Sequence, residues 1–256
     1  MKLSNNQVKY IRSLGQSKFR QKYENFVAEG DKCVTALLHS GFEIESLVAT
    51  SQWLEKNDHL IKSHREKSFY ATEEQMQQLS TLVNAPDILA IVKQKWVKAK
   101  DLLNRFKPLF YLDGVQDPGN VGTIIRVADW FGFGGVILGP GSADVYHPKV
   151  VQASMGSIAA FEVAKADRDE VLSFVASQRV ILLDMAGEDI NKSSLPADAL
   201  FVLGSEGKGI DVEWFQLIPP AQCISILGAV GRMAESLNVG VTAGIIAHSL
   251  TKGIKK

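Results

Sequence analysis

The sequence predicts an α/β protein whose C-terminal part is an open parallel sheet covered by helices. From residue 109 onward, near-continuous apolar runs alternate with amphipathic segments, which is typical of a parallel sheet buried on both faces. Of the 256 residues, 46% are hydrophobic and 22% are charged, an ordinary globular composition. Polar, glycine-containing loops follow three predicted strands, and ligand sites of such sheets lie at the carboxyl ends of the strands.

The first 95 residues predict a separate, small α/β module. Apolar residues at helical spacing, including Phe26, Val34 and Leu37, predict a helix over 19–39. A Thr72 cap precedes a second expected helix. The remaining elements expected in this part are strands at 45–50, 68–71 and 90–95 and that second helix at 73–79.

A change of pattern at Pro108 predicts the domain boundary. The basic, nearly glycine-free segment 96–107 is expected to be a linker, and 108–256 a second domain. The strands expected in the second domain are 109–115, 135–138, 161–164, 180–184, 200–204 and 223–227.

Composition and charge exclude several classes of protein. No apolar stretch approaches the roughly 20 residues of a membrane helix, and the N-terminus lacks a secretion signal, so we expect a soluble, cytoplasmic protein without a membrane partner. Cys33 and Cys223 lie far apart and outside any zinc-type spacing, so we expect buried thiols and no metal.

The net charge is zero, but basic residues are concentrated in two runs. Residues 2–22 contain six Lys or Arg and no acidic residue, and 93–107 contain six against Asp101 alone. These runs fit a surface for a phosphate backbone, and solvated surfaces are an equally good explanation when the runs are taken alone.

The first strand-end loop runs from Asp113 to Gly122 and leads into a predicted helix that contains Arg126. Pro118 and Gly119 indicate a turn, and Asn120 is expected to cap the helix with its side-chain oxygen. Asn120 and Arg126 are less than two helical turns apart and can reach the same edge of the sheet. Taken alone, this segment is explained better by a capped helix and a surface arginine than by a functional site.

The second loop, from Leu203 to Ile210, contains Gly204, Gly207 and Gly209 around Glu206 and Lys208. Glycines at this density indicate tight bends or a close backbone approach. The spacing matches neither a P-loop nor the dinucleotide pattern G-x-G-x-x-G, so the sequence supports neither an ATPase nor an ordinary NAD enzyme.

The third segment runs from Ile224 through Glu235, Ser236 and Asn238 into the last predicted helix. Glu235 or Ser236 is expected to cap that helix. Its small residues allow close packing against another backbone; they are Gly240, Ala243, Gly244 and Ala247.

Together, and in this order, the three segments resemble the three signature motifs of the SpoU (TrmH) branch of the SPOUT RNA 2′-O-ribose methyltransferases. The first resembles D-P-x-N-x-G-x-x-x-R, the second G-x-E-G and the third S-L-N-V-x-x-A. The resemblance covers residues 109 to about 250. Residues 1–95 resemble, less specifically, the L30e-like RNA substrate-binding domain that many members carry.

The resemblance implies a SPOUT domain with a deep trefoil knot, S-adenosylmethionine as the methyl donor, no metal, and a homodimer formed through the C-terminal domain. It further implies methylation of a ribose in RNA, with 23S ribosomal RNA as the expected substrate. Transferred residue by residue, it assigns catalytic or positioning roles to Arg126, Asn120, Glu206, Ser236 and Asn238. Cofactor contacts are implied for Leu203, Gly204, Ile224, Ile226 and Leu237.

The third motif departs from the family pattern. Ser225 stands where the family has proline, and the stretch 227–234 is several residues longer. This departure leaves open an RNA-binding relative without turnover. Within the same class of enzyme, the alternative is a tRNA methyltransferase. A small-molecule enzyme would need a nucleophile and base set, and the five histidines are scattered singly.

Overall fold

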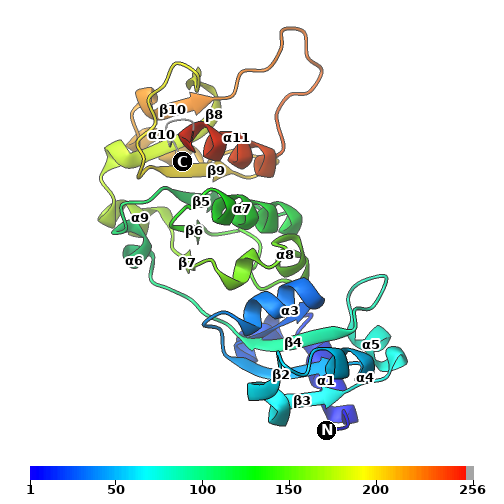
Figure 1. Cartoon of the computed structure of the whole chain (residues 1–256). Helices are drawn as coiled ribbons and strands as arrows, with labels where there is room; N and C mark the ends of the chain where they lie inside the picture. Colours follow the sequence, from blue (N-terminus) through cyan, green and yellow to red (C-terminus); the bar gives the residue numbers. More distant parts are fainter. Residues whose placement is uncertain (252–256) are drawn as a thin grey trace. The chain divides into compact units, whose positions relative to one another are not determined.

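The computed structural model describes residues 1–251, apart from the side chains of residues 221 and 251. The chain forms two compact units (Figure 1). Unit 1 consists of residues 1–95 and 144–160, and unit 2 consists of 96–143 and 161 onward. The second unit is therefore interrupted by a segment that packs in the first.

Unit 1 is built on a four-stranded sheet of order β1-β4-β2-β3. β1 and β2 both pair antiparallel with β4, and β3 pairs parallel with β2. The strands are β1 (Asn25–Glu29), β2 (Ile44–Ala49), β3 (Ser68–Tyr70) and β4 (Ile88–Lys93). The helices are α1 (Asn5–Ser13), α2 (Ser17–Tyr23), α3 (Asp31–Leu38), α4 (Ser51–Lys56), η1 (Lys62–Lys67), α5 (Glu73–Leu79), α8 (Pro148–Ala153) and η2 (Ser157–Ala159).

The predicted helix over 19–39 is wrong, because the segment folds as α2, β1 and α3. Glu24 ends α2 in the left-handed region with a φ of 53°. The next four residues are all buried, and they pair with β4 across the sheet. Tertiary pairing therefore overrides a helical periodicity that is real only within α3. The helix predicted at 73–79 is confirmed as α5, and Thr72 forms a capping box with Gln75.

Residues 144–160 are held in unit 1 by buried polar contacts. The Arg20 guanidinium, almost fully buried, donates two hydrogen bonds to Asp144 and two to the carbonyls of Leu14 and Gly15. The Tyr146 ring stacks on Phe26 of β1 with centroids 4.6 Å apart. These contacts explain why a segment that follows a strand of unit 2 belongs to the core of unit 1.

Unit 2 is built on a six-stranded, all-parallel sheet of order β10-β8-β9-β5-β6-β7. The predicted parallel sheet is confirmed. The strands are β5 (Leu109–Asp113), β6 (Gly135–Leu138), β7 (Val163–Lys165), β8 (Val180–Asp189), β9 (Leu200–Gly204) and β10 (Cys223–Ser225). The helices are α6 (Ala99–Leu103), α7 (Pro118–Trp130), α9 (Arg168–Phe174), η3 (Ser177–Arg179), α10 (Val212–Leu217), η4 (Pro220–Gln222) and α11 (Val239–Thr251).

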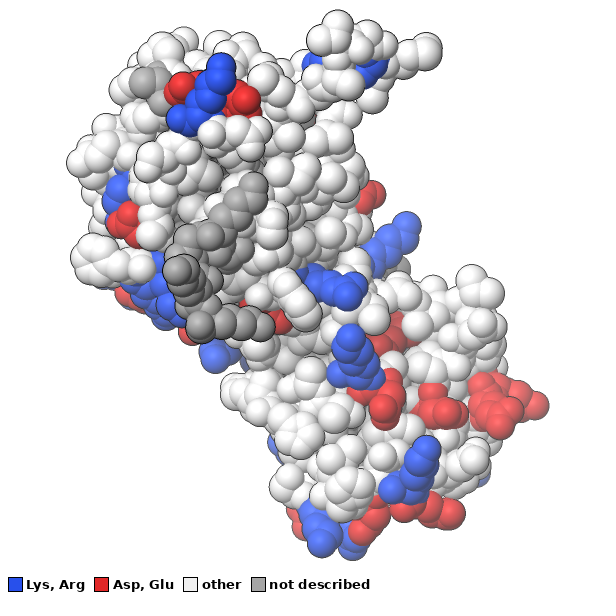
Figure 2. Space-filling model, turned by 45° about the horizontal axis from the view of Figure 1, so that its top comes forward, with Lys and Arg blue, Asp and Glu red and all other residues white. Residues whose placement is uncertain are grey.

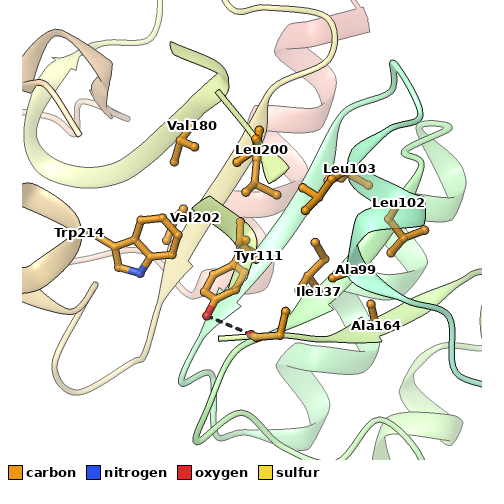
Figure 3. Packing of buried hydrophobic residues seen from close by; sticks show 14 of the residues in the cluster. Ala99, Leu102, Leu103, Tyr111, Ile137, Ala164, Val180, Leu200, Val202 and Trp214 are labelled. Atoms are coloured by element: carbon orange, nitrogen blue, oxygen red, sulfur yellow. Dashed lines mark hydrogen bonds between the residues drawn. The ribbon is translucent and has the colours of Figure 1, made fainter. Parts of the chain in front are cut away.

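One face of the unit 2 sheet is covered by a core in which aromatic and aliphatic side chains interlock (Figure 3). Tyr111 of β5 packs edge-on against Trp214 of α10, and its hydroxyl donates to the Ala166 carbonyl at 3.3 Å. The expected linker 96–107 contains α6, whose Leu102 and Leu103 are buried in this core. The periodicity of a five-residue helix is too short to reveal that burial from the sequence.

The two cysteines differ in burial. Cys33 is buried in α3 as expected, and burial raises the pKa of its thiol to about 12. The expectation of a buried Cys223 is wrong, because this residue begins the edge strand β10 and is partly exposed. On the face seen in Figure 2, acidic and basic side chains of the described residues are interspersed in small groups.

Candidate functional site

Three strand ends of unit 2 carry the loops that the sequence singles out. β5 and β9 are neighbours in register, with Asp113 opposite Gly204. β10 lies at the edge of the same parallel sheet. Because all of these strands run in one direction, their carboxyl ends lie along one edge of the sheet, which is where open α/β folds place their ligands.

The first loop is capped differently from the prediction. The Asp117 side chain accepts the Asn120 backbone N–H at 2.8 Å, and Pro118 occupies the first helical position of α7. Asn120 is therefore not the cap. Its side chain is left free to bond outside its own helix, and the preference of proline for the first helical position is the signal that identifies Asp117.

The second loop folds back on itself. Ser205 and Gly209 exchange two backbone hydrogen bonds of 2.9 and 3.0 Å, and Gly209 has a φ of +70°. A Cβ at position 204 would lie 2.2 Å from the Gly209 carbonyl carbon, so only glycine fits where the loop closes. This geometry presents Glu206 at the exposed tip.

A chain of side-chain hydrogen bonds joins all three loops. The Asn120 Nδ2 donates to Glu206 Oε1 at 2.8 Å, and the Asn238 Nδ2 donates to Asn120 Oδ1 at 2.8 Å. Both amides are thereby oriented, with the Glu206 carboxylate as the final acceptor. Three residues predicted from separate motifs thus meet in one network, which we name the strand-end network.

Asn238 also begins the last helix. Its Oδ1 accepts the backbone N–H groups of Gly240 at 2.9 Å and Val241 at 3.3 Å. The expectation that Glu235 or Ser236 caps this helix is therefore wrong. α11 then packs against α7, and a Cβ on Gly240 would lie 3.0 Å from the Thr123 side chain. The helices that follow the first and third loops are thus adjacent.

A second link between the first two loops was missed by the sequence analysis. The Asp113 carboxylate at the end of β5 accepts the Asp211 backbone N–H at 2.7 Å. Burial raises the pKa of this carboxyl group, and the hydrogen bond from Asp211 opposes that shift. Only tertiary proximity could reveal the pairing, since the two residues are far apart in sequence.

The remaining predicted site residues differ in environment. Leu203 and Ile224 are buried, Ile226 is half-buried and Leu237 is 48% exposed. Arg126 and Ser236 are exposed, and neither side chain has a hydrogen bond or ion pair with any other residue in 1–251. The structure therefore joins Asn120, Glu206 and Asn238. The side chains of Arg126 and Ser236 remain available to a ligand.

The third loop, residues 226–238, extends away from the body of unit 2 between β10 and α11 (Figure 1). From Leu227 onward its large apolar side chains are exposed, and Met233 reaches 98% exposure. Within the loop, Arg232 donates from its backbone and side chain to the Ala229 carbonyl, both at 3.4 Å. Apart from Asn238, the third loop has the fewest contacts with the rest of unit 2 among the three loops.

Ser225, at the base of that loop, carries an unpaired polar atom. Its hydroxyl is buried at the end of β10 and has no hydrogen-bond partner among the described residues. A buried hydroxyl without a partner costs about 1–3 kcal/mol. The Ser225 hydroxyl therefore needs a hydrogen-bond partner, which a ligand or an ordered water can supply.

Residues 1–251 contain no cluster of His, Cys, Asp or Glu that could hold a metal ion. Within the same range, no helix is long and apolar enough to cross a membrane.

Comparison with known proteins identifies relatives of both parts of the chain. Residues 107–248 match the SpoU rRNA Methylase family, and residues 5–90 match the MRM3-like substrate binding domain. The 23S rRNA (guanosine(2553)-2′-O)-methyltransferase RlmP of Bacillus subtilis is 28% identical over 251 residues, covering 96% of each chain.

The solved structures that match over nearly their full length include two RNA methyltransferases. The AdoMet-bound rRNA methyltransferase from Sinorhizobium meliloti superposes with a TM-score of 0.87 at 27% identity, covering 100% of this chain and 98% of that one. A TrmH-family RNA methyltransferase from Porphyromonas gingivalis gives a TM-score of 0.82 at 32% identity, covering 98% of both chains.

Proposed function

The chain belongs to the SpoU rRNA methylase family, and we propose that it transfers a methyl group from S-adenosylmethionine to a ribose 2′-hydroxyl of 23S ribosomal RNA in the cytoplasm. The observation that carries this proposal is the strand-end network, because it unites the three family motifs through Asn120, Glu206 and Asn238. The Bacillus subtilis relative, which acts on a guanosine of 23S rRNA, supports the choice of substrate.

We assign cofactor binding to Leu203, Gly204, Ile224, Ile226 and Leu237. The half-buried Ile226 and the exposed Leu237 supply apolar surface, and the buried Leu203 and Ile224, with the closed turn at Gly204, support the strand ends beneath them. The unpaired Ser225 hydroxyl between Ile224 and Ile226 fits a strand end that binds a polar ligand. When bound, S-adenosylmethionine supplies an electrophilic methyl group on a sulfonium.

The protein has to position the ribose and stabilise the charge that develops on its 2′-oxygen. We assign this role to Arg126, an exposed guanidinium on α7 without a protein partner among the described residues. A guanidinium in a protein remains protonated, so it serves as a donor rather than a base. It binds the neighbouring phosphate and stabilises the alkoxide, and the proton leaves late or through water.

Asn120, Glu206 and Asn238 act as positioning residues, since their side chains hold the loops at fixed distances from one another. Ser236 lies outside that network, and we assign it a contact with the ribose. The fold of unit 2 is that of SPOUT methyltransferases, and the trefoil knot implied by the family remains an expectation.

We also propose a homodimer formed through unit 2. Ala243 and Ala247 of α11 are fully buried within the unit, so the small-residue face is not the surface available to a second copy. Exposed apolar side chains on α7 and α11 are available instead, namely Trp130 at the C-terminal end of α7, which is 82% exposed, and Val241 near the N-terminal end of α11. Light scattering of the wild type and of Trp130→Glu tests this interface, and a monomeric wild type would refute it.

Mapping of ribose methylation tests the proposed function. RNA from cells lacking the protein should lose one 2′-O-methyl group in 23S rRNA, and purified protein with S-adenosylmethionine should restore it. Loss of a tRNA methyl group instead would establish the alternative substrate. Calorimetry tests whether the protein binds S-adenosylmethionine. A folded protein that binds RNA but does not bind S-adenosylmethionine would be an inactive relative.

A further inference from the structure

An aromatic cluster lies on the surface of unit 1, near the edge strand β1. Phe19 and Tyr23 are one helical turn apart on α2, and their rings stack with centroids 6.2 Å apart and planes 10° apart. Tyr10 of α1 meets Tyr23 edge-on at 5.1 Å. Tyr23 is 36% exposed. We name these three rings the aromatic platform.

Hydrogen bonds anchor the elements that carry the platform. The Tyr10 hydroxyl accepts a hydrogen bond from Asn25 at 2.7 Å and donates to Glu45 at 3.1 Å. Within α2, Arg20 lies between Phe19 and Tyr23 in the sequence, and its guanidinium is buried and bonded to Asp144. Tyr10 and the helix that carries Phe19 and Tyr23 are therefore each anchored to the rest of unit 1 by polar contacts.

Unpaired cations surround the platform. The Lys18 Nζ lies 4.9 Å from the Phe19 ring centroid, and the Lys22 Nζ lies 5.2 Å from that of Tyr23. Neither lysine forms an ion pair with a residue in 1–251. Of the nearby carboxylates, Glu24 is paired with Lys93 at 3.3 Å, and Glu45 is bonded to Tyr10.

Two lysine side chains lie over the rings of the platform, and they limit which ligands can bind there. Flexible, exposed lysines lie over the ring faces, so a flat ligand can displace them without opening the core. The displaced ammonium groups remain next to that ligand. A planar aromatic group flanked by negative charge therefore fits this surface, which matches a nucleotide base between two phosphates.

We propose that the aromatic platform binds an unpaired nucleotide of the RNA substrate, with its base stacked on Tyr23 and its flanking phosphates bound by Lys18 and Lys22. Bases in a duplex are already stacked, so only a single-stranded or bulged nucleotide can use the ring. This inference rests on the proposed function, and it adds the feature of the RNA that unit 1 recognises.

Fluorescence anisotropy with two RNA probes tests the platform in the full chain. The probes are a short oligoadenylate and the same strand annealed to oligouridylate as a blunt duplex. Tyr23→Leu should weaken oligoadenylate binding about tenfold or more, since stacking on one aromatic ring is lost, and should leave duplex binding unchanged. Tyr23→Phe keeps the ring and should bind as the wild type does.

Tyr70 provides the matched control. It is 38% exposed and lies on β3, at the opposite edge of the same sheet. Tyr70→Leu should therefore leave binding of both probes unchanged, and thermal melting of each variant confirms that it folds. For oligoadenylate, the slope of log Kd against the logarithm of the salt concentration should fall by about 1.4 in the double variant Lys18→Ala/Lys22→Ala, because two phosphate contacts are lost.

Equal binding of oligoadenylate by Tyr23→Leu and the wild type overturns the platform, as does a wild type that fails to bind the probe. Methyl transfer to 23S rRNA, measured in parallel, separates the two hypotheses. If transfer persists while Tyr23→Leu binds normally, the platform is wrong and the proposed function stands. If the wild type transfers no methyl group to any RNA, the proposed function has failed.

Discussion

The second and third loops of the site differ in how much of the protein supports them. Residues 204–211 are fixed by the Ser205–Gly209 bridge, by the backbone N–H of Asp211 on Asp113 and by Glu206 on Asn120. Residues 226–237 extend outward with exposed apolar side chains. The difference indicates that contacts within the chain preorganise one side of the site and give the other side little support.

The largest expected effect contrasts two exposed arginines. Arg126→Ala should slow single-turnover methylation on the order of 10²–10³-fold, because a donor to the developing alkoxide is lost, while S-adenosylmethionine affinity should not change. Arg232→Ala, on the extended loop, should leave the rate within about twofold because its side chain contacts Gly228 and Ala229 of its own loop. A larger effect at Arg232 than at Arg126 would reverse the roles of the two regions.

The second effect contrasts two glycines of the ordered loop. Gly204→Ala should lower the free energy of unfolding by about 1–3 kcal/mol, because its Cβ would meet the Gly209 backbone. Gly207→Ala should change it by less than about 0.5 kcal/mol, since nothing lies within 4 Å of a Cβ there. Urea unfolding measures both, and equal midpoints would show that the loop is not closed as described.

The third effect concerns the strand-end network. Asn120→Ala and Asn238→Ala each remove their mutual hydrogen bond of 2.8 Å, so the double variant should be less destabilised than the sum of the single variants. The expected coupling is about 0.5–1.5 kcal/mol, the net value of one hydrogen bond. Additive losses in urea unfolding would mean that the two loops are not linked energetically.

The smallest effect is expected in the extended loop. Deletion of residues 230–232 should change the free energy of unfolding by less than about 0.6 kcal/mol, because these residues leave the core untouched and loop closure depends weakly on length. Trypsin should cleave the wild type first after Arg232, and S-adenosylmethionine should slow that cleavage. A large loss of stability on deletion would indicate that the loop packs against a second copy.

Much of unit 2 could be predicted from the sequence. The strands β6 and β9 have the predicted limits, because their buried residues are consecutive and are followed by glycine or polar residues. In unit 1, the same reasoning joined α2, β1 and α3 into one helix. Short apolar runs fit both periods, and the left-handed Glu24 that separates the elements has no sequence signature.

In the site too, local patterns predict individual residues, and only the tertiary structure shows how they are connected. Asn120, Glu206 and Asn238 were predicted from motifs as separate positions, but their mutual bonds were not. The prediction places the cap of α7 at Asn120 instead of Asp117, since both residue types favour caps, and the signal that separates them is Pro118 at the first helical position.

The sequence by itself determined the parallel sheet of unit 2 and the three motifs at its strand ends, because periodicity and local spacing are properties of consecutive residues. Only the tertiary structure decided that Asn120 bridges Glu206 and Asn238, that residues 144–160 pack in unit 1, and that the third loop extends away from the sheet. Hydrogen bonds between distant residues depend on where the folded backbone brings two side chains, and that placement is not encoded in any local pattern.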